Sequence, residues 1–122
     1  MKNQRNKKLG FKGEELASKY LLQQGLQIIE KNFTKRYGEI DLVCLDHNTL
    51  VFVEVKTRIG NKFGTPEEAI TPWKLHSLVK SCQYYKLFHP DLPDALRIDV
   101  VTVFFKSAEE MDKINWYKNV TG

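Results

Sequence analysis

The chain has 122 residues and a formal net charge of +4, a length that favours one domain with a hydrophobic core of its own. It contains no apolar run of about 20 residues and no apolar leader after its basic start, so we expect neither a membrane-spanning helix nor a secretory signal. The two cysteines, Cys44 and Cys82, stand far apart within apolar patterns, and we expect them to be reduced core residues of a cytoplasmic protein.

The positive charge is concentrated at the N-terminus. Five basic residues precede the first acidic residue: Lys2, Arg5, Lys7, Lys8 and Lys12. A basic arm over residues 1–8, in front of a single domain over residues 9–122, would suit a polyanionic partner such as nucleic acid. A solvated and frayed terminus without any partner explains the same charges equally well.

The first half of the chain is predicted to form a helix and three strands. Apolar residues recur at helical spacing in the first segment, and Gly25 is suited to end that helix. The second and third strands are rich in β-branched residues and are joined by turn-forming residues, so they should form a hairpin. The expected elements are a helix over 10–24, a strand over 26–33, a turn over 35–38, and strands over 39–45 and 50–56.

The second half is predicted to continue with a loop over 57–70, a helix and two strands. Thr71 is suited to cap that helix and Pro72 to be its first residue. A buried strand over 97–105 follows, and then an edge strand over 113–120 with a weaker pattern. The helix makes a crossover between two strands, which should therefore be parallel within a mixed α/β sheet.

Two acidic residues fall opposite each other when the predicted hairpin is built about a two-residue turn. The register that places Val43 opposite Phe52 also places Asp41 opposite Glu54. Facing carboxylates repel each other, at up to about 1 kcal/mol when exposed and more when buried. A cation between them would remove the repulsion, and oxygen ligands without a neighbouring His or Cys favour Mg²⁺ or Mn²⁺ over zinc.

Lys56 follows Glu54 by two residues and should share its face of the strand. There it could hold a water or a scissile phosphate and oppose the charge that develops in a transition state. The same register places Glu39 opposite Lys56, where it could support the metal ligands from behind or, more simply, form a salt bridge with Lys56. A solvent-exposed face with hydrated charges is the alternative, although Phe52 and Val43 on this face argue against full exposure.

The first helix offers another acid. Glu14 is three residues from Phe11 and seven from Leu21, which places it on the inward stripe, whereas Glu15 should face water. An inward acid needs a partner because unpaired burial is costly, and the metal site or Lys56 would supply one. Spacing alone equally allows Glu14 to lie at the edge of the stripe and reach solvent.

Four sequence blocks resemble a known family in their joint occurrence and order. They are Gly13-Glu14, Gly38-Glu39-Ile40-Asp41, Phe52-Val53-Glu54-Val55-Lys56-Thr57-Arg58 and Arg97-Ile98-Asp99-Val100-Val101. Spanning about residues 9–105, they are similar to the YraN-like family of small bacterial proteins. That family resembles archaeal Holliday-junction resolvases of the PD-(D/E)xK nuclease superfamily, although Ile40 replaces the proline of the superfamily motif. The resemblance implies a restriction-endonuclease-like, three-layer α/β fold with a central mixed sheet flanked by helices.

The resemblance also implies site roles. In the superfamily, the acid on the second strand and the acid before x-Lys bind the metal, which by motif match are Asp41 and Glu54. Lys56 would support activation of water, and Glu14 would complete the site. The backbone carbonyl of Val55 corresponds to an added metal ligand in similar sites, and the implied cofactor is Mg²⁺ or Mn²⁺.

Basic residues around these motifs are candidates for phosphate contacts. The predicted nucleic-acid-binding residues are Lys7, Lys8, Lys12, Arg36, Arg58 and Lys62. Charges on loops are ordinarily only solvated, so this set rests on position alone. Lys74 is expected on the surface of its helix, and Arg97 is expected to form a structural ion pair with Asp99.

The sequence therefore predicts a metal-dependent endonuclease that hydrolyses phosphodiester bonds in DNA, including branched or structured DNA. A two-fold symmetric substrate would favour a homodimer. The alternative is a non-catalytic module on the same fold that binds nucleic acid or recruits a partner. A third interpretation is a structural protein whose acidic face is covered by a partner.

Overall fold

The computed structural model describes residues 4–60 and 70–121, with the side chains from residue 7 onward. The described part of the chain contains two helices and five strands. In chain order they are α1 (Gln4–Gln23), β1 (Gln27–Lys35), β2 (Gly38–Asp46), β3 (Thr49–Ile59), α2 (Pro72–Leu87), β4 (Ala95–Ser107) and β5 (Glu110–Tyr117). Neither helix is long and apolar enough to cross a membrane.

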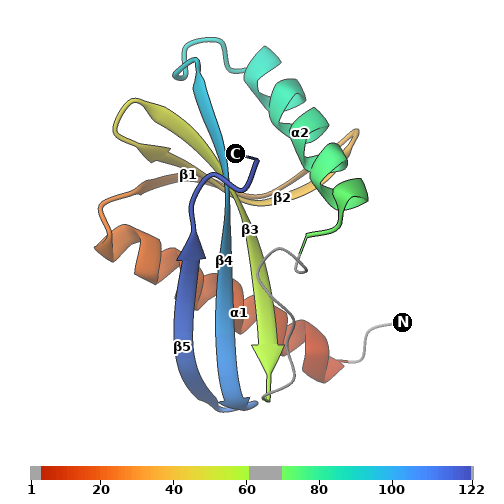
Figure 1. Ribbon diagram of the computed structural model, residues 1–122, viewed down its shortest axis with the longest axis vertical. Coiled ribbons are helices and arrows are strands. Elements are labelled where there is room, and N and C mark those ends of the chain that lie inside the picture. The colour runs from red at the N-terminus through yellow and green to blue at the C-terminus, as the bar shows by residue number, and fades with distance from the viewer. Residues whose placement is uncertain (1–3, 61–69, 122) are drawn as a thin grey trace.

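The strands form one mixed sheet in the order β1-β2-β3-β4-β5. Neighbouring strands are antiparallel except for β3 and β4, which are parallel and are connected through α2. Figure 1 shows the helices on opposite faces of the sheet, which makes three layers. The predicted restriction-endonuclease-like α/β arrangement is thus confirmed.

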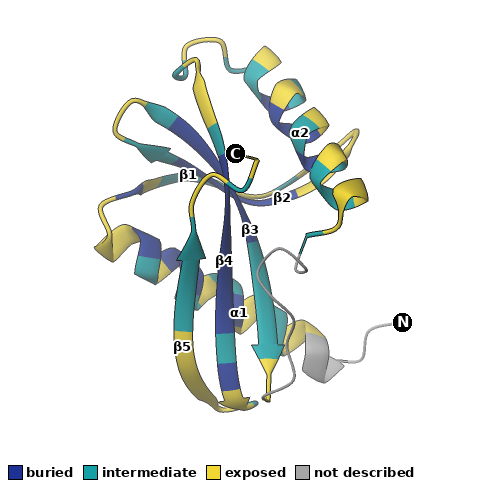
Figure 2. Ribbon diagram, in the orientation of Figure 1, coloured by how far each residue is buried: buried dark blue, intermediate teal, exposed yellow. Residues whose placement is uncertain are grey.

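Each helix buries its apolar side in a separate cluster, and the sheet lies between the two clusters (Figure 2). Under α1, Ala17 and Leu21 pack against alternate residues of β3 and β4 such as Val53. Under α2, Leu78 and Tyr85 pack against the residues of the opposite face. This alternation is what a sheet covered on both sides requires. Cys44 and Cys82 are free and buried, one in each cluster, as predicted.

α1 begins earlier than the sequence predicts. Residues 4–8, which were assigned to a basic arm, form the start of this helix, and Lys7 and Lys8 are exposed on it. The sequence of this segment contains no apolar residue, so apolar periodicity could not reveal it. The N-cap of α2 is confirmed, because the Lys74 backbone N–H donates to Thr71 Oγ1 at 3.1 Å.

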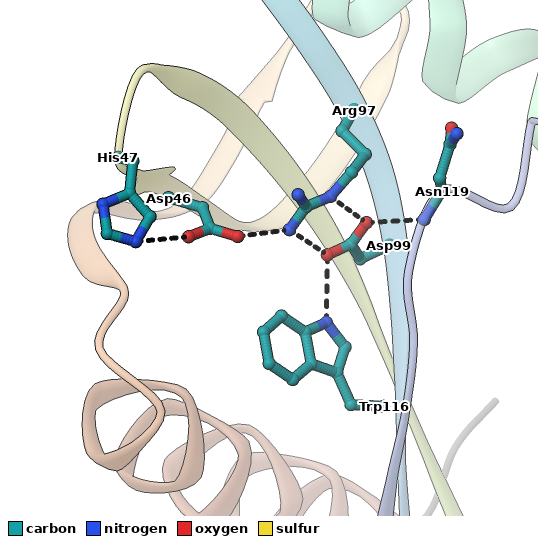
Figure 3. A network of polar contacts seen from close by, with 6 residues as sticks. All are labelled: Asp46, His47, Arg97, Asp99, Trp116 and Asn119. Carbon is teal, nitrogen blue, oxygen red and sulfur yellow. Dashed lines mark hydrogen bonds and ion pairs between the residues drawn. The ribbon is translucent and has the colours of Figure 1, made fainter.

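A buried polar network ties the C-terminal segment to the sheet (Figure 3). The Asp99 carboxylate is fully buried and accepts hydrogen bonds from Arg97 Nε and Nη2, at 2.9 and 3.0 Å. It also accepts from Trp116 Nε1 and from the Asn119 backbone N–H, each at 2.9 Å. Arg97 Nη2 continues to Asp46 Oδ2 at 2.9 Å. The predicted structural ion pair is confirmed, and it joins the β2–β3 hairpin to β4 and β5.

Gly13 brings α1 into direct contact with β3. A Cβ atom at this position would overlap with Thr57 Oγ1 and lie 3.3 Å from Thr57 Cβ. Only glycine permits so close an approach. The next residue along the helix, Glu14, is therefore held at a fixed depth beside the sheet.

The first prediction concerns this close approach. Gly13→Ala should lower the free energy of unfolding by about 1–3 kcal/mol, because overlap with Thr57 outweighs the better helix propensity of alanine. Gly10→Ala is the matched control, since a Cβ there meets nothing within 4 Å and alanine should stabilise the helix by about 0.5–1 kcal/mol. Thr57→Ala should recover part of the loss in the double variant. Equal effects of both glycine substitutions in urea unfolding would contradict the packing argument.

The second prediction concerns the buried network. Asp99→Asn places an amide N–H₂ group against donors of Arg97 and Trp116, and it should lower the free energy of unfolding by about 3–5 kcal/mol. Trp116→Phe removes one hydrogen bond and should cost about 1 kcal/mol. Thermal or urea unfolding measures both. An Asp99→Asn loss no larger than that of Trp116→Phe would show that Asp99 does not organise the network.

Candidate functional site

One cavity, of about 530 Å³, gathers the four residues that the sequence singled out as catalytic candidates. It opens where α1, β2, β3 and the start of α2 meet. Its lining includes Glu14, Glu39, Asp41, Glu54, Val55, Lys56, Thr57, Arg58 and Lys74. A second cavity, of about 660 Å³, lies between α2 and the C-terminal segment, and its lining is mainly apolar and aromatic. Because ionisable groups converge only in the first of these two cavities, we consider it the candidate site.

The candidate site lies where β2 and β3 stop pairing. The predicted register holds from Asp46 opposite Thr49 to Leu42 opposite Val53, and there the ladder ends. The expected next pair, Asp41 opposite Glu54, is therefore not formed, and this detail of the prediction is wrong. The reason is that the Asp41 side chain takes over the role of a ladder carbonyl.

A backbone-to-side-chain hydrogen bond connects the strands beyond that point. The Val55 backbone N–H donates to Asp41 Oδ2 at 2.8 Å. This contact satisfies a backbone donor that the ladder no longer pairs. It also fixes the orientation of the Asp41 carboxylate beside the next part of β3. Asp41 and Glu54 thus line the same cavity although the ladder does not pair them.

The two carboxylates are nearly buried and carry like charges. Asp41 is 9% exposed and Glu54 is 6% exposed. Burial, followed by the charge of Glu54, raises the pKa of Asp41 from 3.8 to about 7, against the opposing effect of the Val55 N–H. Glu54 Oε2 is buried and accepts no hydrogen bond from any residue that the structure describes. Such an unsatisfied, negatively charged site is chemically suited to a cation.

Lys56 provides a positive charge at this site. Its Nζ lies 3.3 Å from Glu54 Oε1, and its side chain is 23% exposed. The predicted salt bridge between Lys56 and Glu39 is wrong. The β2–β3 ladder ends before it reaches Glu39 and Lys56, and Lys56 pairs with Glu54 of its own strand.

Glu14 faces the cavity from α1. It is partly buried and lines the cavity, whereas Glu15 is exposed. Phe11, which was expected on the same inward stripe, is 65% exposed, so Glu14 lies at the edge of the buried stripe formed by Ala17 and Leu21. Burial raises the pKa of Glu14, and the charges of Glu39 and Glu54 raise it further. Among the described residues, however, no three His, Cys, Asp or Glu side chains are placed to hold a metal ion together. A bound cation would therefore need main-chain, water or substrate oxygens besides Asp41 and Glu54.

The predicted phosphate-binding residues are dispersed. Arg58 lines the cavity, and its Nη1 donates to the Thr57 carbonyl at 3.0 Å. Arg36 lies at the β1–β2 turn and stacks over the Tyr37 ring, 5.7 Å from its centroid. Lys62 lies outside the described residues.

The lysines of α1 do not line the cavity. Lys7 and Lys8 are exposed just before Leu9, which does contribute to its wall. Lys12 points toward the far end of β4, where its Nζ lies 3.5 Å from the Ala108 carbonyl. Those of the predicted basic residues that the structure describes are therefore not gathered at one place.

Sequence reasoning missed two residues at the site. Lys74, which was expected on the helix surface, is partly buried and lines the cavity from the first turn of α2. The topology contained a signal for it, because a crossover helix starts beside the carboxyl end of the strand before it. Asn32 of β1 contacts two of the cavity carboxylates. Its only sequence signal is that asparagine tolerates a left-handed backbone.

Comparisons with known proteins agree on one family. The model of "Uncharacterised protein family UPF0102" matches residues 13–103. A UPF0102 protein of Syntrophomonas wolfei subsp. wolfei is 46% identical over 110 residues, covering 90% of this chain and 94% of that protein. A UPF0102 protein of Clostridium perfringens is 35% identical over 114 residues, covering 93% of both chains. A UPF0102 protein of Chlorobium chlorochromatii is 45% identical over 95 residues, covering 78% of this chain and 73% of that protein.

The third prediction follows from the raised pKa of Asp41. The folded chain keeps this proton up to about pH 7, whereas an ordinary aspartate loses it near 3.8. The folded state thus binds more protons between these values, and its free energy of unfolding should fall as the pH rises through that range. Asp41→Asn removes this penalty, and it should raise the free energy of unfolding by up to about 4 kcal/mol at about pH 8 but by little at about pH 4.

Urea unfolding at the two pH values measures this difference. Asp112→Asn, at an exposed aspartate of β5, is the matched control and should leave the pH dependence unchanged. If Asp41→Asn lowers the free energy of unfolding equally at both pH values, the Asp41 carboxylate is not under charge repulsion in the folded chain.

Proposed function

The chain belongs to the uncharacterised protein family UPF0102, and we propose that it is a metal-dependent endonuclease that hydrolyses phosphodiester bonds in DNA. One observation carries the proposal: the nearly buried carboxylates of Asp41 and Glu54 share a cavity with the Lys56 ammonium. Placing two like charges together in a partly buried site destabilises a protein unless something neutralises them. A divalent cation with its substrate phosphate would do so.

The oxygen donors of the cavity fit Mg²⁺ or Mn²⁺. The Asp41 and Glu54 carboxylates and the Val55 carbonyl would hold the ion. Two protein carboxylates are few for a metal site, but Mg²⁺ commonly keeps several waters and uses one or two carboxylates together with substrate phosphates. When bound, the ion would lower the pKa of a water molecule and neutralise charge on the phosphate.

The residues of the chain would have separate tasks. The Val55 N–H holds the Asp41 carboxylate in one orientation, so that the carboxylate need not reorganise when a ligand arrives. The Lys56 ammonium, now 3.3 Å from Glu54 Oε1, would donate to the attacking water or to a phosphate oxygen and oppose the developing negative charge. Because Asp41 holds a proton up to about pH 7, metal and proton would compete for it below that pH.

The cavity also contains cations suited to a nucleic-acid backbone. Arg58 and Lys74 line it beside Lys56, and Lys7 and Lys8 are exposed at the adjoining end of α1. Contacts of this kind position a phosphate backbone without reading bases, so the shape of the DNA would matter more than its sequence. Branched and structured DNAs are therefore the first substrates to test. Cutting both strands of a symmetric junction would need two sites, which favours a homodimer.

A second candidate function is a non-catalytic module that binds nucleic acid on the same fold. It is favoured by the lack, among the described side chains, of a three-residue metal-binding group. In that case the Lys56–Glu54 ion pair and a proton on Asp41, whose pKa is raised to about 7, would neutralise these two carboxylates without a cation. Binding and cleavage measured separately distinguish the two functions.

The fourth prediction is that the protein cleaves at least one member of a panel of linear, nicked, flapped and four-way DNAs in the presence of Mg²⁺ or Mn²⁺. Asp41→Asn and Glu54→Gln should each reduce the cleavage rate by about 100-fold or more, because each removes a charge on which the metal depends. Glu14→Gln should also reduce it. Glu15→Gln, one residue away on the exposed side of α1, is the matched control and should leave the rate unchanged.

Binding measurements complete the test. Mn²⁺ titrated into the free protein should release or absorb heat in wild type and not in Asp41→Asn, and Mg²⁺ should raise the melting temperature only of wild type. Wild type and Asp41→Asn that bind DNA alike and cut nothing would replace the endonuclease with the binding module. Absence of both cutting and binding would exclude both functions.

A further inference from the structure

Asn32 has a backbone conformation that is rare for a residue with a side chain. Its φ angle is 54°, in the left-handed region, which asparagine tolerates better than most residues. Its neighbours Lys31 and Phe33 pair with Leu42 and Ile40 of β2. Asn32 therefore stands at the level of Asp41 across the β1–β2 ladder.

At this level, the regular alternation of side chains between the two faces of the sheet is interrupted on both β1 and β2. On β1, Glu30 accepts a hydrogen bond from the Tyr85 hydroxyl at 2.9 Å, and the Phe33 ring packs edge-on against the same Tyr85, 4.9 Å between centroids. Strand residues three positions apart normally point to opposite faces. On β2, Ile40 and Val43 likewise pack together on the α2 side. The left-handed conformation of Asn32 lets the alternation on β1 be interrupted at the same level as that on β2.

The Asn32 side chain reaches two acids of the candidate site. With its amide nitrogen toward them, Nδ2 donates to Glu14 Oε1 and to Glu39 Oε1, each at 2.8 Å. An asparagine amide has two N–H donors, so both are used. Glu14 belongs to α1 and Glu39 to β2, and both line the cavity. The amide thus holds together two carboxylates that would otherwise repel each other.

We propose that Asn32 is a positioning residue, whose left-handed backbone and side-chain amide hold Glu14 and Glu39 in place beside Asp41. Without the amide, Glu14 would turn away from Glu39 toward solvent. The cavity would then lose the carboxylate that α1 contributes. The effect on cleavage rests on the proposed nuclease function, whereas the contact itself can be tested in the free protein.

Asparagine combines tolerance of a left-handed backbone with a neutral side-chain amide that donates two hydrogen bonds. Glycine adopts the left-handed conformation freely but has no amide. Aspartate tolerates the conformation but would bring a third negative charge against Glu14 and Glu39. Asn32→Gly therefore removes the contact while it keeps the backbone. Asn119→Gly is the matched control, because Asn119 is also left-handed, with φ 56°, and lies in the C-terminal segment away from the cavity lining.

The fifth prediction is measured by NMR on the free protein. In wild type, the two Glu14 γ-methylene protons should have distinct signals because the side chain is held. In Asn32→Gly, with the fold retained, these signals should merge as Glu14 becomes mobile, whereas Asn119→Gly should leave them unchanged. Glu14→Gln and Glu39→Gln should each shift the Asn32 side-chain amide signals in an otherwise wild-type chain. Glu14 signals that stay distinct in Asn32→Gly would overturn the proposal.

Cleavage assays then test the role of the contact. Asn32→Gly should lower the turnover rate by about 10-fold, the scale of lost positioning at a metal site, with DNA affinity nearly unchanged. Asn32→Asp should lower it further. A wild-type protein that cleaves no DNA would refute the nuclease function and leave the NMR result to decide the contact. Turnover by Asn32→Gly equal to that of an active wild type would overturn the positioning role.

Discussion

The hydrogen bond from the Val55 N–H to the Asp41 carboxylate is the contact on which the candidate site depends. It stands at the point where β2 leaves β3, and it replaces a main-chain acceptor with a charged side chain. The Val55 N–H thus keeps a hydrogen-bond acceptor, and the Asp41 carboxylate lies in the same cavity as Glu54. A regular ladder would have continued the sheet, but it would not have opened the cavity in which the acids and Lys56 meet.

Stabilising contacts around the cavity let the folded chain tolerate the charge repulsion between the carboxylates inside it. The Asp99 network fastens the hairpin, β4 and the C-terminal segment at a separate place in the sheet, and two apolar clusters cover both faces. Gly13 lets α1 lie directly on Thr57, which fixes the approach of Glu14. Stabilising contacts of this kind permit a folded protein to keep destabilising groups at a functional site.

The sequence predicts the regular parts of this molecule well, because periodic patterns reflect repeated geometry. The mixed sheet with helices packed on it, the register from Asp46 to Leu42 and the cap at Thr71 follow from such patterns, whereas the three-layer fold was implied by the family resemblance. The sequence-based predictions fail where a side chain takes the place of a backbone group in the hydrogen-bonded ladder. Asp41 ends the ladder, so extrapolating the register to Glu39 and Lys56 fails. The contacts of Asn32 and Lys74 depend on how distant elements meet, which no local pattern encodes.

The charges of the cavity suggest why metal and DNA would bind together. Four carboxylates (Glu14, Glu39, Asp41 and Glu54) face three cations (Lys56, Arg58 and Lys74) along its lining. The formal sum is one negative charge, which disfavours a phosphodiester by itself. A divalent ion would reverse that sign, and the single negative charge of the phosphodiester would then balance it. Binding of the metal ion would thus raise the affinity for DNA, and binding of DNA would raise the affinity for the metal ion by the same factor.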